Sequence, residues 1–199
     1  MSSDAKQVRR RMSHERILDA AARAVCRDGY AGVGVAHVMK EAGLTHGGFY
    51  AHFESRDALL AQALEHAGKQ SIDRLRERLR AGAEGGVSPL RALIEAYLSE
   101  AHVQALDSGC PVAALGADLR RGEPELRAVA ARRVQQLADL VRESLAPGTP
   151  DGAALVVASA LVGAVQMARV LDGEQREAVL RNAREALIAQ YDRGSAADR

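Results

Sequence analysis

The sequence predicts an all-helical protein of about nine helices. Ala and Leu are abundant, aromatic residues make up only 3% of the 199 residues, and no stretch shows sustained alternation of β-branched residues. A chain of this length forms one large domain or two small ones, and either can bury a core without help. We expect no strands.

Charge is balanced overall but concentrated near the N-terminus. The net charge of +1, from 27 basic and 26 acidic residues, argues against coating nucleic acid by bulk charge. Residues 6–16, however, contain five basic residues and one acidic residue. This arm, which includes Arg11, can contact phosphate or the minor groove, or it can be a solvated tail.

Cysteine usage and the N-terminal composition favour the cytoplasm. Cys26 and Cys110 are too few for a disulfide framework, and charges stand where a signal peptide needs an apolar run. Residues 152–168 are uncharged, but they are few for a membrane span, and we interpret them as a buried helix.

The first predicted helix begins at Ser13, a good N-cap, and ends at Asp28-Gly29. A stripe of apolar residues follows helical spacing along it: Ile17, Leu18, Ala21, Ala22 and Val25.

Residues 35–53, VAHVMKEAGLTHGGFYAHF, have the order of a helix, a tight turn and a second helix. Val35, Val38, Met39 and Ala42 recur at helical spacing. Gly43 supplies a left-handed stop, and the Thr45 hydroxyl can cap the next helix. The pattern predicts a helix-turn-helix.

The second helix of this pair, residues 45–53, contains no Asp or Glu and can approach phosphate without repulsion. Gly47 and Gly48 each lower helix propensity by about 1 kcal/mol relative to Ala, so close approach to another surface explains them better than stability. Tyr50 and His52 carry polar tips that can bond phosphate oxygens. Phe49 and Phe53, four residues apart, should face inward with the core.

The segments AGLTHGGFYAHF and SRDAL (residues 42–53 and 55–59) resemble the helix-turn-helix and fourth helix of the tetracycline-repressor (TetR) family of bacterial transcription regulators. The resemblance covers residues 1–65. Arg56 stands where the family usually has a Lys that touches the DNA backbone. Gly34 replaces a frequent Thr, which leaves backbone N–H groups to hold a phosphate. The residues expected at DNA are Arg11, His37, Thr45, His46, Gly47, Gly48, Tyr50, His52 and Arg56.

The resemblance also implies partners. Members of the family dimerise through their last two long helices, which form a four-helix bundle, and the homodimer binds palindromic double-stranded DNA. A small-molecule inducer changes the DNA affinity, and repression is the commoner outcome. The sequence leaves open the inducer, the operator and the sign of regulation.

The rest of the chain is predicted to form further helices. Ser55 caps a long helix that runs to about residue 80 and connects the DNA-reading unit to the C-terminal helices. After a glycine-rich break at residues 81–87, Ser88-Pro89 starts a helix whose apolar face continues to Ala101. Further helices start at Pro111 and Pro124, and two more cover about residues 151–171 and 174–191.

This order predicts a DNA-binding domain over residues 1–54 and a ligand-binding and dimerisation domain over residues 55–199. The helix at 151–171 is apolar nearly all round, which suggests that a partner subunit covers it. A purely intramolecular core is the alternative.

Four polar-tipped residues on apolar stretches are candidates for binding a ligand: Tyr97, His102, Cys110 and Gln166. Cys110 also precedes a helix start, a position that favours the thiolate form. An alternative function is therefore a thiol-based sensor of oxidants or electrophiles, with Arg120 and Arg121 as nearby cations.

Two other classes of protein are alternatives to a DNA-binding regulator. An enzyme with Cys110 as nucleophile and His102 as base lacks a third partner, a phosphate-binding glycine loop and a metal-spaced cluster, so we expect no catalysis, cofactor or metal. The second alternative, in which the helix-turn-helix binds another protein instead of DNA, remains open.

Overall fold

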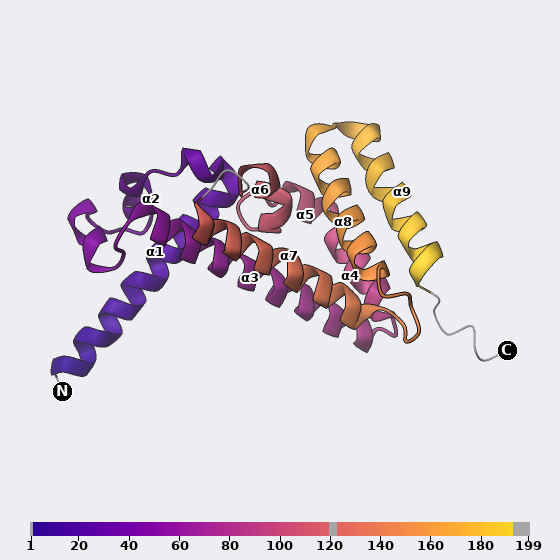
Figure 1. The fold of residues 1–199 in the computed structure, drawn as a ribbon, viewed down its shortest axis with the longest axis horizontal. Coiled ribbons are helices and arrows are strands. Elements are labelled where there is room, and N and C mark those ends of the chain that lie inside the picture. The colour runs from indigo at the N-terminus through magenta and orange to yellow at the C-terminus, as the bar shows by residue number, and fades with distance from the viewer. Residues whose placement is uncertain (1, 120–122, 193–199) are drawn as a thin grey trace.

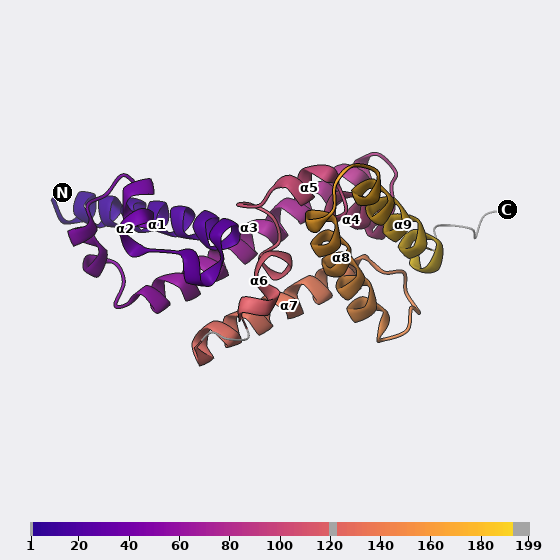
Figure 2. The same ribbon diagram turned by 90° about the horizontal axis from the view of Figure 1, so that it is seen from above.

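The computed structural model describes residues 2–119 and 123–192, which form nine α-helices and one 3₁₀ helix and, within these ranges, no strand. In chain order the elements are α1 (Ser2–Gly32), α2 (Val35–Glu41), the 3₁₀ helix η1 (His46–Ala51), α3 (Arg56–Glu84), α4 (Pro89–Tyr97), α5 (Glu100–Gln104), α6 (Pro111–Leu119), α7 (Pro124–Ser144), α8 (Ala153–Val170) and α9 (Gly173–Tyr191). The all-helical prediction is confirmed. The α8–α9 pair lies at the opposite end of the molecule from α2, and α3 and α7 run side by side between them (Figures 1 and 2).

Helix α1 begins at Ser2, so the prediction that Ser13 caps it is wrong. The first turns project from the rest of the molecule (Figure 1). Residues 4–12 contain neither Gly nor Pro, Asp4 lies in the first turn where the helix dipole favours an acid, and Arg11 and Glu15 pair at 3.9 Å one turn apart. The basic arm is therefore helical. At the other end the predicted stop is confirmed, because Gly29 leaves the helical conformation with φ 75°.

The turn between α2 and η1 follows the prediction. Gly43 has φ 67°, which only a residue without a Cβ adopts readily. Val38, Met39 and Ala42 are buried, and so are Phe49 and Phe53.

The second helix of the pair is shorter and tighter than predicted. Residues 45–53 were expected to be α-helical, but η1 is a 3₁₀ helix over six residues, and the Thr45 side chain makes no cap hydrogen bond. Instead, backbone bonds of the i to i+3 type run from Gly48 N to Thr45 O (3.0 Å) and from His52 N to Phe49 O (2.9 Å). Two adjacent glycines in so short a segment disfavour a regular α-helix, which explains the difference.

Helix α3 passes through two hydrophobic cores. The Ser55 hydroxyl accepts a hydrogen bond from Ala58 N at 3.0 Å, which confirms the predicted cap. Leu59 and Leu64 belong to a core shared with α1, α2 and η1, whereas Leu75 belongs to a second core with α4, α7, α8 and α9. Helix α3 therefore connects the two cores.

The helix after Ser88 ends earlier than predicted. The Ser88 hydroxyl caps α4 by accepting from Arg91 N at 3.2 Å, as expected. The apolar face does not continue to Ala101 in one helix, because the Ser99 hydroxyl accepts from His102 N at 3.2 Å and caps a separate helix, α5. Local side-chain capping interrupts the apolar pattern here.

Helix α8 is covered by its own chain on one face only. Val157, Leu161 and Val165 are buried against α7 and α9. On the other face, four large apolar side chains are between 53% and 84% exposed: Leu155, Val156, Met167 and Val170. The helix has the length and composition to cross a membrane, but its buried face packs in the protein core.

Candidate nucleic-acid interface and ligand region

The segment around η1 is exposed, and contacts within the chain do not explain its glycine at position 47. Tyr50 is 74% exposed, and Thr45 and His46 are also on the surface. A Cβ added to Gly47 would meet no atom within 4 Å, and neither Gly47 nor Gly48 has a positive φ. The fold itself therefore does not require glycine at position 47.

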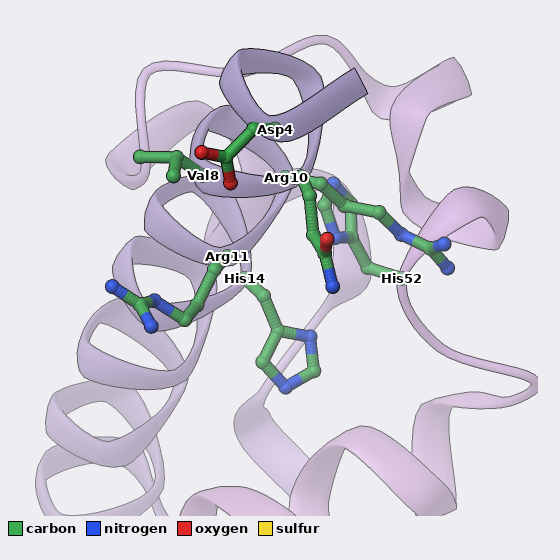
Figure 3. Close-up of a pocket in the computed structure, with 7 residues that line it drawn as sticks. Asp4, Val8, Arg10, Arg11, His14 and His52 are labelled. Carbon is green, nitrogen blue, oxygen red and sulfur yellow. The ribbon is translucent and has the colours of Figure 1, made fainter. Parts of the chain in front are cut away.

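The N-terminal turns of α1 form a cleft with the end of η1. Asp4, Arg10, Arg11, His14 and His52 line this open cleft of about 630 Å³ (Figure 3). The cleft contains two guanidinium groups and two imidazoles but one carboxylate, so it favours an anion. Arg11 and His52 were expected at DNA and Arg10 belongs to the basic arm expected at phosphate, but His14 was not predicted to lie beside Arg10. Their spacing of four residues would have placed them on one face if the helix had been extended to Ser2.

His52 and its neighbours are held in a defined arrangement. The His14 ring stacks on Phe53 at 4.6 Å and lies 6.0 Å from the His52 ring. Arg10 Nη2 donates to Ala51 O at 2.9 Å, which ties α1 to the last residue of η1. Burial, followed by the charges of His14 and Arg10, lowers the pKa of His52. Its Nδ1 is buried and has no hydrogen-bond partner among the described residues.

Arg56 is placed differently from the other candidates. Its Nε donates to Val33 O at 2.9 Å and its Nη2 donates to Tyr30 O, while the guanidinium carbon lies 5.0 Å from the centre of the Tyr30 ring. The Tyr30 hydroxyl in turn donates to Asp57 at 2.6 Å. Arg56 thus joins the end of α1 to the start of α3, a role that sequence analysis missed because the carbonyls are more than 20 residues away.

Two more polar residues lie near the turn that presents η1. His37, which was expected at DNA, is exposed, and its Nε2 lies 3.2 Å from Glu41 Oε1. Arg16, which sequence analysis did not single out, donates from Nη2 to Ala42 O directly below the Gly43 turn. Arg16 therefore supports the geometry that presents η1.

The structure brings three of the four candidate ligand residues together. The rings of Tyr97 and His102 meet edge to face at 4.5 Å, His102 Nδ1 lies 2.5 Å from Tyr97 O, and Cys110 N donates to His102 Nε2 at 3.0 Å. A neutral imidazole with its proton on Nδ1 satisfies both bonds. Burial lowers the pKa of His102, which favours the same neutral state. Gln166 lies elsewhere, on the outer face of α8, where its Nε2 is 3.4 Å from Ala113 O.

The three residues lie in a buried polar cluster. The Tyr97 hydroxyl is buried without a hydrogen-bond partner in the described part of the chain, and burial and then Cys110 raise its pKa. Arg169 donates from Nε to Val103 O at 3.3 Å, and its charge helps to lower the pKa of His102. Burial, and then the charge of Cys110, raise the pKa of Cys26 to about 11, so this thiol stays protonated at neutral pH. The cations proposed from sequence, Arg120 and Arg121, lie outside the described residues.

Comparison with known proteins gives two family matches that together span most of the chain. Residues 17–63 match the bacterial regulatory proteins of the tetR family, and residues 86–186 match the tetracyclin repressor-like C-terminal domain. An uncharacterized HTH-type transcriptional regulator of Mycobacterium tuberculosis is 29% identical over 189 residues, covering 88% of this chain and 94% of that protein.

Solved structures agree with these matches. A TetR transcriptional regulator from Chloroflexus aurantiacus is 27% identical with a TM-score of 0.74, covering 92% of this chain and 96% of that one. The reduced form of E. coli NemR has the same TM-score at 20% identity, covering 90% and 96% of the two chains, and so shows a shared fold. With the helix-turn-helix observed where the first family match lies, the chain belongs to the TetR family of bacterial transcriptional regulators.

Proposed function

We propose that the protein is a ligand-responsive repressor that binds a palindromic operator as a homodimer and leaves it when a small-molecule inducer binds. In this proposal residues 1–54 bind DNA, residues 55–199 bind the inducer and the second copy, and the protein acts in the cytoplasm. The observation that carries the proposal is η1: it is exposed, free of acidic residues, and has a glycine at position 47 that the chain's own packing does not need.

The uncovered face of α8 supports the homodimer. Monomeric proteins rarely leave so many large apolar side chains together on one helix face. This face borders an apolar groove between α7 and α8 that includes Val134, which is 46% exposed. A two-fold axis would let each copy cover the other. The two η1 segments then enter successive major grooves roughly 34–36 Å apart, which requires a palindromic site.

Base recognition has to work without Lys or Arg in η1. Arginine and lysine make the usual bidentate contacts to guanine, and residues 45–53 contain neither. Thr45, His46 and the backbone at Gly47 and Gly48 are the groups that can reach base edges. Tyr50, His52 and the α1 cleft supply contacts to phosphate. Specificity should therefore depend strongly on close fit and on DNA shape.

Release requires that the inducer prefers a conformation in which the two η1 segments are wrongly spaced, because only differential affinity shifts such an equilibrium. Helix α3 is suited to transmit the change, since it is shared by both cores. The cluster of Tyr97, His102 and Cys110 supports a site for the inducer in the second core.

A mobility-shift assay with the DNA that flanks the protein's own gene tests the proposal. We expect a shift with this DNA and a much weaker one with a scrambled fragment of equal length. No shift with any flanking fragment, or a monomer in analytical ultracentrifugation, refutes it and leaves a role in protein interaction.

A matched pair of glycine variants sharpens this test. Gly47→Ala should weaken operator binding by about tenfold or more, because a methyl group crowds the DNA contact. It should leave the free energy of unfolding unchanged or raise it by up to about 1 kcal/mol, since a Cβ fits there. Gly85→Ala is the control, because a Cβ at Gly85 makes only ordinary van der Waals contacts and this residue follows the end of α3 that is remote from η1.

A second candidate function is thiol sensing by Cys110 on the same scaffold. The observation that favours it is the placement of Cys110 in the same buried cluster as Tyr97, with its backbone N donating to His102 Nε2 at 3.0 Å. The similar fold of NemR, whose structure is described as a reduced form, fits this candidate without deciding it.

The cysteines provide their own control. Cys110→Ser should abolish release from DNA by hypochlorite or an electrophile, whereas Cys26→Ser should not. If Cys110→Ser is still released, sensing by this thiol is excluded and the small-molecule inducer remains.

A further inference from the structure

An open cleft between α3, α4 and α5 has the size and charge of a small-molecule site. Its volume is about 440 Å³, which lies within the range of drug-sized ligand pockets. Arg74 and Arg78 enter it from α3, four residues apart and therefore on one helix face. His102 lines it from α5, so the cleft lies directly beside the buried cluster of Tyr97 and Cys110.

The charges that line the cleft are unequal. Arg74 donates from Nη2 to the backbone oxygen of Ser108, and Arg78 has no hydrogen bond or ion pair among the described residues. The acid in the lining is Glu95, whose Oε1 lies 3.9 Å from Arg91 Nη1. The lining thus contains two guanidinium groups and one carboxylate, and that carboxylate is already paired with Arg91. An anion is the complement that this arrangement favours.

The remaining walls are formed by apolar side chains and three serines. Leu75, Ala96, Ala101 and Ala105 supply the apolar surface, and Ser71, Ser99 and Ser108 lie among them. A ligand that fits both parts has one anionic end and an apolar body, because an inorganic anion would leave the apolar walls wet.

We propose that this cleft is the inducer site and that it takes an organic monocarboxylate, with its carboxylate on Arg78 and Arg74 and its apolar body against the α4–α5 wall. This inference rests on the proposed function, of which it names the ligand class. The ligand bridges α3 to α4 and α5. Since α3 continues into the DNA-binding core, holding its second half fixes the position of its first half.

The test uses 2-naphthoate and its neutral isostere 2-naphthamide, with octanoate as an aliphatic acid, measured by isothermal titration calorimetry on the full chain. We expect the two acids to bind saturably and the amide to bind at least about tenfold more weakly. Arg78→Gln should weaken naphthoate binding about tenfold and leave the amide unchanged. Glu95→Gln should strengthen naphthoate binding, because it removes the carboxylate from the cleft.

Arg80→Gln is the control, since Arg80 is exposed on the same helix but does not line the cleft. Any one of three results overturns the inference. These are equal binding of acid and amide, equal effects of the variants at positions 78 and 80, and no saturable binding of either acid. The same preparations are assayed for binding to the flanking DNA. If the chain binds the DNA but neither acid, only the assignment of the cleft as the ligand site is rejected. If the unmodified chain does not bind the DNA, the proposed function is rejected.

Discussion

The contact between α3 and α7 includes an ion pair, and removal of one partner should cost much more stability than removal of the other. Arg133 Nη2 lies 2.7 Å from Glu65 Oε1. The side chain of Arg133 is only 4% exposed, whereas that of Glu65 is 47% exposed and also has Arg132 at 3.6 Å. The arginine stem fills the space above Gly68, where an added Cβ would lie 2.1 Å from Arg133 Cδ.

Glu65→Ala leaves a buried guanidinium without its carboxylate. Breaking a buried pair in this way costs about 3 kcal/mol or somewhat more. Arg133→Met leaves a carboxylate on a half-exposed side chain that keeps Arg132 as its ion-pair partner, and methionine keeps most of the apolar stem. Its cost should be about 1 kcal/mol. The two variants thus differ by about 2 kcal/mol although each removes the same ion pair.

Urea unfolding at one fixed protein concentration measures both costs, because the stability of the proposed dimer would depend on concentration. For a chain of this size, Glu65→Ala should lower the melting temperature by about 6–12 °C. Glu143→Ala is the control: Glu143 pairs with Arg76 at 3.7 Å on the exposed surface of the same two helices, and its loss should cost almost nothing. Equal destabilisation by Glu65→Ala and Arg133→Met would refute the burial argument.

Four further predictions concern the DNA-reading unit and the buried cluster. Tyr50→Ala should weaken binding to operator and random DNA alike, whereas His46→Ala should change the base preference in a selection from randomised operators. Equal losses of affinity for both variants on all DNA would contradict the assignment of Tyr50 to phosphate and His46 to bases. Arg56→Ala should also weaken binding to all DNA, and in addition lower the free energy of unfolding by about 1–2 kcal/mol in a urea titration, because its guanidinium holds two backbone carbonyls. Gly43→Ala should cost about 1–2 kcal/mol in the same titration, since φ is 67°, and an unchanged midpoint would argue against the left-handed turn. Burial lowers the pKa of His102, so the unfolded chain binds more protons and the free energy of unfolding should fall as the pH drops below about 6.5. His102→Gln should make this fall smaller between pH 7.5 and pH 5. If the variant and the unmodified chain lose stability equally over this range, His102 is not the group responsible.

The parts of the fold that were predicted correctly depend on signals that act within a few residues. Gly43 turns the chain because it has no Cβ, and Ser55 and Ser88 cap helices through hydrogen bonds to residues three positions later. Phe49 and Phe53 face inward because they are four residues apart. These interactions form between residues that are close together in the sequence, so they can be predicted without knowing where distant segments of the chain lie.

The wrong predictions arose where two local signals competed. Ser13 looks like a cap, but the helix-forming residues before it continue α1 to Ser2. The apolar pattern after Ser88 favours one helix, but the Ser99 hydroxyl starts another. The glycines of η1 disfavour the α-helix that its spacing suggests. In each case the two local structures differ in free energy by only about 1 kcal/mol, so the sequence pattern alone does not decide between them.

The sequence by itself determined that the protein is helical, where the helix-turn-helix lies, and that Phe49 and Phe53 face the core. Only the tertiary structure decided that Arg56 binds carbonyls of the preceding helix end, that Tyr97, His102 and Cys110 meet while Gln166 does not, and that one face of α8 stays uncovered. The physical reason is distance along the chain. Helix propensity and capping act within one turn, whereas these contacts join residues from different helices, and their geometry exists only after the two cores have packed.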